Sequence, residues 1–280
     1  MEAWKRILTK VLKYGEKRAD RTGVGTLALF GEAVTFDNSA TFPAVTTKKL
    51  AFNSVAAELA CFLKGYDNLE QFNAMGCNIW NGNGNSSYWL PKSRRIGDLG
   101  RIYGVQWRDW RSVIVNESGL ESVTVDQLKN LVDGMRKEPH GRRHVVTALN
   151  PGELSQMCLP PCHILFQAYV STDGQVNFIV YMRSVDLFLG LPFDVASYAL
   201  LQKLLAKELG LDSGFITFFL GDTHIYLNHL EQVETVISRE EHPAPILHLE
   251  PAASLFNFHP SQAWLADYTS YPFLPATLNI

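Results

Sequence analysis

The segment LPPCHILFQ places one cysteine, Cys162, directly after two prolines and before a histidine. Proline fixes the backbone, so this cysteine is expected in a stiffened loop. A cysteine attacks carbon as its thiolate, which needs nearby positive charge. A lone cysteine is also commonly a small buried hydrophobe. The segment therefore allows two interpretations, a nucleophile or a core residue.

Four arginines stand beside small polar residues or strand ends, where an anion site is easily built. Arg21 precedes TGVGT, Arg142 and Arg143 precede an apolar strand, and Arg183 is followed by Ser184. Guanidinium groups bind phosphate through paired hydrogen bonds. Each arginine taken alone fits a solvated surface charge equally well. The glycines of TGVGT match neither a P-loop nor a dinucleotide fingerprint, so they add little.

The elements that must position these residues follow from hydrophobic periodicity. Four segments have helical spacing, and the last of them is expected to be capped by Asp194: 3–17, 52–63 before Gly65, 123–136, and 193–210. Five segments predict strands: 26–38, 144–150, 163–170, 177–189, and 216–230, which runs toward a helix. Residues 81–100 read as a long binding loop. No linker or repeat interrupts the chain, so we expect one α+β domain over residues 1–280.

Composition excludes several classes of protein. The 280 residues are 46% hydrophobic and 19% charged, with a formal net charge of −3, which argues against disorder and against nucleic-acid binding. No secretory signal and no membrane-spanning run is visible, so we expect a cytoplasmic protein. Four cysteines lack the paired spacing of a zinc site, and no metal is expected.

Nine stretches carry a family resemblance, in order and at nearly the right spacing. They are DRTGVGT, FPAVTTKK, ELACFLKG, NIW, GDLGRIYGVQWR, GRRHVVTALNPGEL, LPPCHILFQAYV, RSVDLFLGLPFDVASYALL and GDTHIYLNH. Together they resemble thymidylate synthase from about Arg21 to His229. The resemblance implies an α+β fold with mixed twisted sheets flanked by helices. It also implies a sheet-to-sheet homodimer and 5,10-methylenetetrahydrofolate as cofactor.

The resemblance also assigns roles around the reacting carbon. Cys162 matches the nucleophile that adds to pyrimidine C6, and Glu58 matches a carboxylate that orders water and relays protons. A glutamate inside the apolar run VAAELACFL is otherwise costly to bury. Tyr103 matches a tyrosine that helps remove the C5 proton. His163 resembles a supporting position rather than the base of a catalytic triad.

The remaining matched positions hold the substrates, a pyrimidine nucleotide and a reduced folate. Arg21, Arg183 and Ser184 match a phosphate cradle within one subunit. Arg142 and Arg143 match a pair that reaches the partner's phosphate, which implies active sites shared across the dimer. The sugar would contact His224 and Tyr226, and the folate would contact Trp80, Asp186 and the C-terminal Ile280.

Asp194 departs from the family pattern, because thymidylate synthases carry asparagine there. An asparagine amide complements uracil, with an acceptor for N3–H and a donor for O4. Cytosine reverses that pattern, so an aspartate could accept from its 4-amino group and, when protonated, donate to N3. The alternative is that Asp194 only caps a helix. An aspartate here resembles the deoxycytidylate hydroxymethylases of bacteriophages.

Further departures point to a changed pocket. Met182 replaces a common glutamine, and NGNGNSS lacks a second tryptophan beside the folate. Arg94 and Arg95 in the same loop are either a solvated pair or contacts for a polyglutamate tail. Ser184 is retained, which favours a deoxyribonucleotide over a ribonucleotide.

Three activities remain open, in decreasing order of preference: deoxycytidylate hydroxymethylase, deoxycytidylate methyltransferase, and thymidylate synthase acting on dUMP. They share cysteine addition and one-carbon transfer, and they differ in whether water or a hydride completes the product. A non-catalytic RNA-binding relative is disfavoured, because Cys162, Glu58 and the phosphate arginines occur together.

Overall fold

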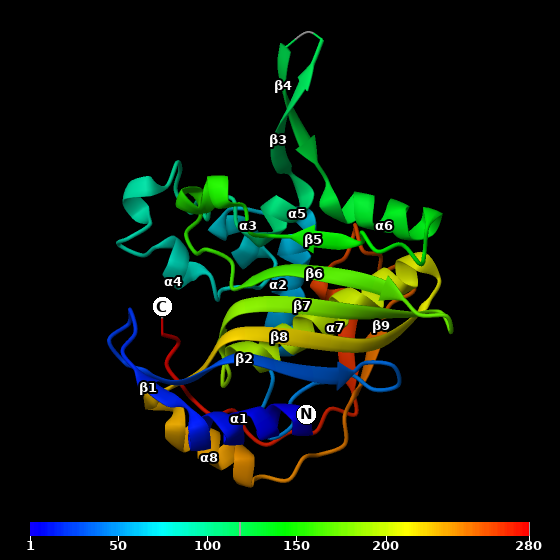
Figure 1. The fold of residues 1–280 in the computed structure, drawn as a ribbon. Helices are drawn as coiled ribbons and strands as arrows, with labels where there is room; N and C mark the ends of the chain where they lie inside the picture. Colours follow the sequence, from blue (N-terminus) through cyan, green and yellow to red (C-terminus); the bar gives the residue numbers. More distant parts are fainter. Residues whose placement is uncertain (118, 280) are drawn as a thin grey trace.

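The computed structural model describes residues 1–117 and 119–279, built around one six-stranded sheet in the order β1-β2-β8-β7-β6-β5 (Figure 1). The strands of this sheet are β1 (Glu16–Arg18), β2 (Thr26–Asp37), β5 (Val145–Thr147), β6 (His163–Val170), β7 (Gln175–Asp186) and β8 (Asp212–Tyr226). Two hairpins lie outside it, β3 (Trp110–Asn116) with β4 (Gly119–Val125), and β9 (Ile246–Leu249) with β10 (Ala263–Ala266).

Helices and short 3₁₀ turns surround the sheet. The α-helices are α1 (Glu2–Tyr14), α2 (Phe52–Lys64), α3 (Leu69–Ala74), α4 (Asn81–Gly84), α5 (Tyr103–Arg108), α6 (Gln127–Lys137), α7 (Gly190–Leu209) and α8 (Leu230–Ser238). The 3₁₀ turns are η1 (Leu90–Lys92), η2 (Pro151–Gln156), η3 (Leu227–His229) and η4 (Pro260–Gln262). The predicted α+β fold, with a mixed sheet flanked by helices, is confirmed.

The sheet is mixed because β7 and β8 run parallel while the other neighbouring strands are antiparallel. A parallel pair needs a long crossover, and α7 provides it. The register pairs Asp186 with His224, and Cys162 lies one residue before β6 beside Arg183. The end of β7, the end of β8 and the start of β6 therefore meet at one end of the sheet.

Helices α2 and α7 form the core layer against one face of the sheet. Every residue of α2 from Val55 to Leu63 is buried, so this helix has no solvent face. Its closest neighbour is α5, where a Cβ on Gly104 would lie 2.3 Å from the carbonyl oxygen of Phe62. Only glycine permits this approach, which fixes α5, and with it Tyr103, against α2.

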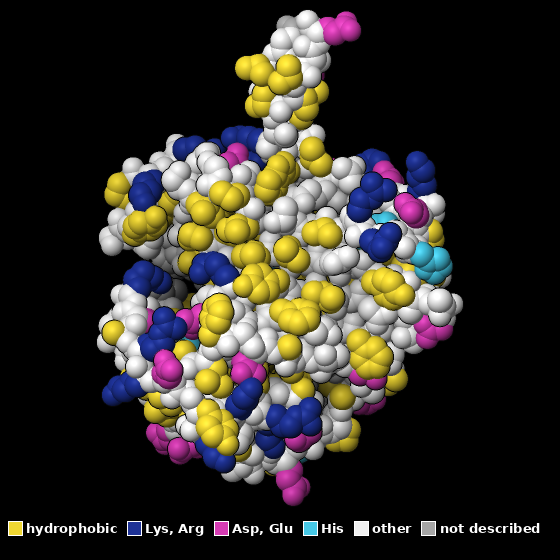
Figure 2. Space-filling view, viewed as in Figure 1, with side chains coloured by type: hydrophobic (Ala, Val, Ile, Leu, Met, Phe, Trp, Pro, Cys, Tyr) yellow, Lys and Arg dark blue, Asp and Glu magenta, His cyan; other side chains and the backbone are white. Residues whose placement is uncertain are grey.

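The opposite face of the sheet carries exposed hydrophobic side chains. Figure 2 shows them gathered over the strands. They come from adjacent strands and include Tyr169, Ile179, Tyr181, Phe215 and Phe219. A contiguous apolar patch on a sheet face is typical of a protein–protein interface.

The hairpin β3–β4 projects away from the body of the molecule (Figure 1). The sequence predicted a helix over 123–136, and that prediction was wrong at its start. Residues 123–125 belong to β4, since β-branched Val123, Thr124 and Val125 pair with β3. Helix α6 begins only after Asp126, whose side chain accepts a hydrogen bond from the Lys129 amide at 3.0 Å.

The start of helix α7 also differs from the prediction. This helix begins earlier, at Gly190 rather than after Asp194. One oxygen of Asp186 accepts hydrogen bonds from the amides of Phe188 and Leu189 at 2.9 and 3.1 Å, which turns the chain into the helix. Asp194 lies within the helix. The interpretation of Asp194 as a helix cap was therefore wrong.

Candidate active site

Cys162 lies at the start of β6, partly exposed, with its backbone held on both sides. Its amide donates to the Tyr103 hydroxyl at 2.7 Å, and its carbonyl accepts from the Arg183 amide at 2.8 Å. The remaining cysteines that the sequence offers, Cys61, Cys77 and Cys158, are buried. Cys162 is thus the thiol that a substrate can reach.

Arg183 supplies the positive charge beside this thiol. Its guanidinium donates to the carbonyls of Pro161 and Pro160 at 2.8 and 2.9 Å, and its Nη2 lies 3.9 Å from Cys162 Sγ. Burial raises the pKa of the Cys162 thiol, while Arg183 opposes that increase. The two prolines therefore do more than stiffen the loop, because their carbonyls hold the arginine against the sulfur.

Glu58, Trp80 and Tyr103 form a second group on the helical side of the site. Trp80 Nε1 donates to Glu58 Oε1 at 2.8 Å. Burial raises the pKa of Glu58 to about 7, although the Trp80 hydrogen bond opposes this. A carboxyl with such a pKa gains and loses a proton readily near neutral pH, as a proton relay requires. The Trp80 and Tyr103 rings meet edge to face, 5.8 Å apart.

Asp194 lies deep in the site, with 18% of its side chain exposed and its Oδ1 4.0 Å from His163 Nε2. Burial raises the pKa of Asp194 well above its usual range, and the Glu58 and Asp186 carboxylates add to the effect. Burial also lowers the pKa of His163 to about 3. His163 is therefore neutral near pH 7, and the 4.0 Å contact is not an ion pair.

The turn that carries Arg21 is pinned to the same end of the sheet. The Asp20 carboxylate accepts from the Thr22 hydroxyl and amide at 2.6 and 3.0 Å and from the Gly25 amide at 2.7 Å. The Thr22 hydrogen bond is the main cause of the lowered pKa of Asp20. Arg21 itself is exposed, and its side chain makes no hydrogen bond or ion pair with a residue that the structure describes.

His224 and Tyr226 stand on β8 next to this turn, since Tyr226 pairs with Thr26 on β2. His224 Nδ1 lies 3.0 Å from Asp222 Oδ1, which holds the ring and favours a proton on Nδ1. The other ring nitrogen is then a hydrogen-bond acceptor. The rings of His224 and Tyr226 meet edge to face, 5.0 Å apart.

Asp186 and Ser184 precede the β7–α7 turn. Oδ1 of Asp186 is used by backbone amides, while its second oxygen has no partner among residues 1–117 and 119–279. Lys48 is buried nearby and donates to the Phe188 carbonyl at 2.7 Å. Burial lowers the pKa of Lys48 to about 8, and Asp186 opposes that decrease.

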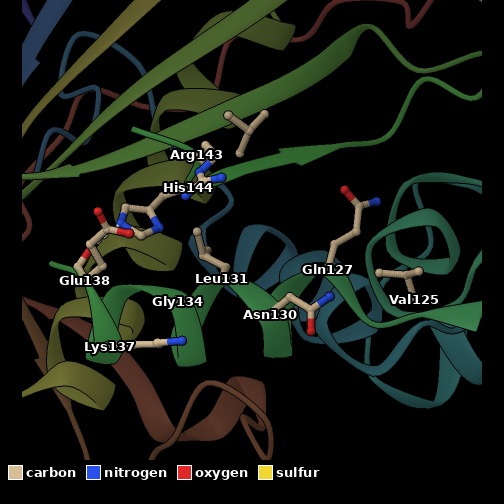
Figure 3. Close-up of a pocket in the computed structure, with 10 residues that line it drawn as sticks. Val125, Gln127, Asn130, Leu131, Gly134, Lys137, Glu138, Arg143 and His144 are labelled. Atoms are coloured by element: carbon tan, nitrogen blue, oxygen red, sulfur yellow. Dashed lines mark hydrogen bonds between the residues drawn. The ribbon is translucent and has the colours of Figure 1, made fainter. Parts of the chain in front are cut away.

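Arg142 and Arg143 are not brought to Cys162 within this chain. The Arg142 carbonyl accepts from Gln167 Nε2 at 3.4 Å, which places it five residues along β6 from Cys162. At about 3.3 Å per residue that separation is roughly 17 Å. Figure 3 shows Arg143 beside a hollow of about 420 Å³ that His144, Gly134 and Lys137 also line, between α6 and β5.

The loop over residues 81–100 is more ordered than predicted, because it contains α4 and η1. Its two arginines have acidic partners. Arg94 Nε lies 3.1 Å from Asp98 Oδ2, and Arg95 pairs with Asp67. Both arginines are therefore ion-paired, while about half of each side chain stays exposed.

The site therefore combines a reachable thiol with a guanidinium, two carboxyls whose pKa values are raised by burial, and an exposed arginine on an ordered turn. A sequence model of the thymidylate synthase family matches residues 2–280. The chain belongs to the thymidylate synthase family. Members transfer a one-carbon unit to C5 of a pyrimidine nucleotide, and they bind that nucleotide and methylenetetrahydrofolate.

The family match does not separate activity on deoxycytidylate from activity on deoxyuridylate. Ile280, which was predicted to contact the folate, lies outside the described residues. The tail before it packs on α8 and η3, where the Thr277 carbonyl lies 2.9 Å from His229 Nε2. Within the described residues no cluster of His, Cys, Asp or Glu is suited to hold a metal ion, and no helix is long and apolar enough to cross a membrane.

Sequence reasoning missed three residues that shape the site. Asp20 and Asp222 hold the Arg21 turn and His224, and Tyr198 is hydrogen-bonded to His163 at 2.8 Å. The signal for Tyr198 was its spacing, since residues four apart share a helix face and Asp194 stands four before it. No sequence pattern identified the two aspartates, because their place in the site depends on the register in which β2 pairs with β8.

Proposed function

We propose that this enzyme transfers a hydroxymethyl group to C5 of deoxycytidylate. The observation that carries the proposal is the largely buried carboxyl of Asp194, 18% exposed, at the family position that reads the base; burial raises its pKa and so favours the protonated acid. A neutral acid offers one donor and one acceptor, which complements cytosine N3 and the 4-amino group. Because Asp194 lies inside α7 and caps nothing, the helix gives no reason for an aspartate there.

Cys162 is the proposed nucleophile. Its sulfur forms a bond to pyrimidine C6, and the electron pair displaced from the C5–C6 double bond makes C5 nucleophilic. Arg183 stabilises the thiolate. The Asp194 proton, donated to N3, neutralises the charge that builds on the base. This step does not occur with an ionised carboxylate, so the raised pKa of Asp194 supports it.

Glu58 and Tyr103 are proposed to move the C5 proton. Tyr103 already accepts a hydrogen bond beside Cys162, and Glu58 has a pKa of about 7. Arg21, Arg183 and Ser184 would bind the nucleotide phosphate. His224, protonated on Nδ1, would accept a hydrogen bond from the sugar 3′-hydroxyl, with Tyr226 beside it.

The folate would be held by Trp80 and Asp186. The unpaired carboxylate oxygen of Asp186 fits a pterin, whose ring presents N–H donors. Methylenetetrahydrofolate supplies the one-carbon unit at the oxidation level of formaldehyde. The segment NGNGNSS after Trp80 lacks the second tryptophan of the family, so the wall beside the folate would be polar, which favours entry of the water that a hydroxymethyl product needs.

Incubation with methylenetetrahydrofolate and dCMP, dUMP or CMP tests the proposal. We expect dCMP to be the preferred substrate and mass spectrometry to find 5-hydroxymethyl-dCMP, without a rise in dihydrofolate absorbance. Dihydrofolate formed in step with a dCMP product would make the enzyme a methyltransferase. Preference for dUMP would make it a thymidylate synthase.

The active form is proposed to be a homodimer joined through the apolar sheet face. The roughly 17 Å between Arg142 and Cys162 of one chain supports this, because the arginine is too far away to serve its own site. In a dimer with shared sites, it would serve the partner's site.

Mixing two inactive variants tests the shared site. The Arg142→Ala/Arg143→Ala variant lacks only the arginine pair that would reach the partner's active site. The Cys162→Ala variant lacks only the nucleophile. Random exchange of subunits makes about half of the dimers hybrid, and each hybrid has one complete active site out of two. Activity should therefore recover to about a quarter of the wild-type value.

Cys162→Ala mixed with Arg183→Ala is the matched control. These two residues belong to the same site, so no hybrid contains a complete one. Native mass spectrometry verifies that the subunits exchange. Exchange without recovery in the first mixture would show that each site is built from one chain.

A further inference from the structure

His163 lies between two side chains of a single helix. Its Nδ1 is 2.8 Å from the Tyr198 hydroxyl, and its Nε2 is 4.0 Å from Asp194 Oδ1. Asp194 and Tyr198 are four residues apart on α7, so they project from the same side of it. The imidazole therefore bridges a tyrosine and the candidate base-reading acid.

The tautomer of His163 follows from counting donors. Tyr198 is buried, and its hydroxyl makes no other hydrogen bond to a residue in the described ranges. If Nδ1 carried the proton, the tyrosine O–H would lack an acceptor, and a buried unsatisfied donor is costly. If the tyrosine donates to Nδ1, its buried hydroxyl has an acceptor. Nε2 then carries the imidazole proton and faces Asp194 Oδ1.

A neutral aspartate alone does not distinguish cytosine from uracil. With its proton on one oxygen, it donates to N3 and accepts from the 4-amino group of cytosine. With the proton on the other oxygen, it accepts from N3–H and donates to O4 of uracil. Selectivity for cytosine requires a neighbour that fixes which oxygen carries the proton.

We propose that Tyr198 is a positioning residue that, through the tautomer of His163, keeps the acid proton of Asp194 on Oδ2. The Nε2–H group favours a bare oxygen opposite it, so Oδ1 is the acceptor. The 4.0 Å separation is long for a hydrogen bond, and such contacts commonly tighten when substrate binds. This inference rests on the proposed function and adds that Oδ1 is the oxygen that faces the 4-amino group.

The surroundings of His163 do not compete for its Nε2 proton. One face of the imidazole packs on the Tyr103 ring, with centroids 4.3 Å apart, and Phe62 lies 6.4 Å away. Burial is the main cause of the raised pKa of Asp194, and the carboxylates of Glu58 from α2 and Asp186 from β7 raise it further. Cys162 adjoins His163 in sequence, but its thiol contacts Arg183.

The test compares kcat/KM for dCMP and dUMP in the wild type, in Tyr198→Phe and in the exposed control Tyr14→Phe. Tyr198→Phe should lower the dCMP:dUMP ratio about fivefold, the effect of losing one buried hydrogen bond. A purely structural role would reduce both activities together and leave the ratio unchanged. Tyr14→Phe should match the wild type.

The second measurement needs no turnover. Nitrogen chemical shifts of ¹⁵N-histidine-labelled wild-type enzyme report the His163 tautomer, and we expect the proton on Nε2. A proton on Nδ1 would overturn the inference even if Tyr198→Phe does not fold. An unchanged ratio in a folded Tyr198→Phe would also overturn it. Preference of the wild type for dUMP would instead contradict the proposed function.

Discussion

Cys162→Ser should lower kcat by about 10³-fold or more, because a serine hydroxyl is scarcely ionised near neutral pH and the covalent route is lost. Nucleotide affinity should stay nearly unchanged, since the phosphate and base contacts belong to other residues. Steady-state kinetics measures the first effect, and calorimetric titration with dCMP measures the second.

The surroundings of Cys162 explain why the loss should be so large. Arg183 is held by two proline carbonyls at 2.8 and 2.9 Å, so its charge stays beside the sulfur. The Tyr103 hydroxyl accepts a hydrogen bond from the Cys162 amide at 2.7 Å, which holds the backbone of the nucleophile in place. A serine keeps this geometry but lacks a stabilised anion, so the variant isolates the chemical step.

Cys158→Ser is the matched control. Cys158 is four residues earlier and buried, and burial raises the pKa of its thiol to about 12. This variant should keep turnover near the wild-type value. Near-normal turnover by Cys162→Ser would contradict covalent catalysis and would point to a family member that binds nucleotide without forming the C6 adduct.

Hydrophobic spacing predicted the elements whose apolar side chains form the core. Helix α2 and strands β6 to β8 fall close to where periodicity placed them, because apolar contacts decide their position. Residues 123–125 were misassigned because the pairing of β4 with β3 outweighs a helical pattern. The early start of α7 depends on hydrogen bonds that the Phe188 and Leu189 amides donate to Asp186, which no local pattern encodes.

The convergence of the site was predicted through family motifs rather than through spacing. Ser184 pairs with Asp222 and Asp186 with His224 only because β7 and β8 run parallel, which depends on the α7 crossover. The bridge of His163 between Asp194 and Tyr198 is likewise tertiary. A sequence shows which residue types are present, but strand register decides which side chains meet.

Asp194→Asn should shift the preference from dCMP to dUMP, with a total change in the ratio of kcat/KM values of about 10³-fold or more. The amide keeps the size of the carboxyl but presents an acceptor and a donor that match N3–H and O4 of uracil. The effect is large because Asp194 is only 18% exposed, so water does little to compensate a mismatched pair. Substrate competition with both nucleotides, read by mass spectrometry, gives the ratio directly.

Glu208→Gln, at the far end of the same helix, is the matched acid-to-amide control and should leave the ratio unchanged.

Stability provides a second check. An acid whose pKa is raised by folding binds its proton more tightly in the native state, so wild-type stability falls as pH rises above the unfolded value of about 4. Asp194→Asn removes that dependence, so its melting temperature relative to wild type should rise with pH. A wild type that already prefers dUMP, with no change in ratio on substitution, would show that Asp194 does not read the base.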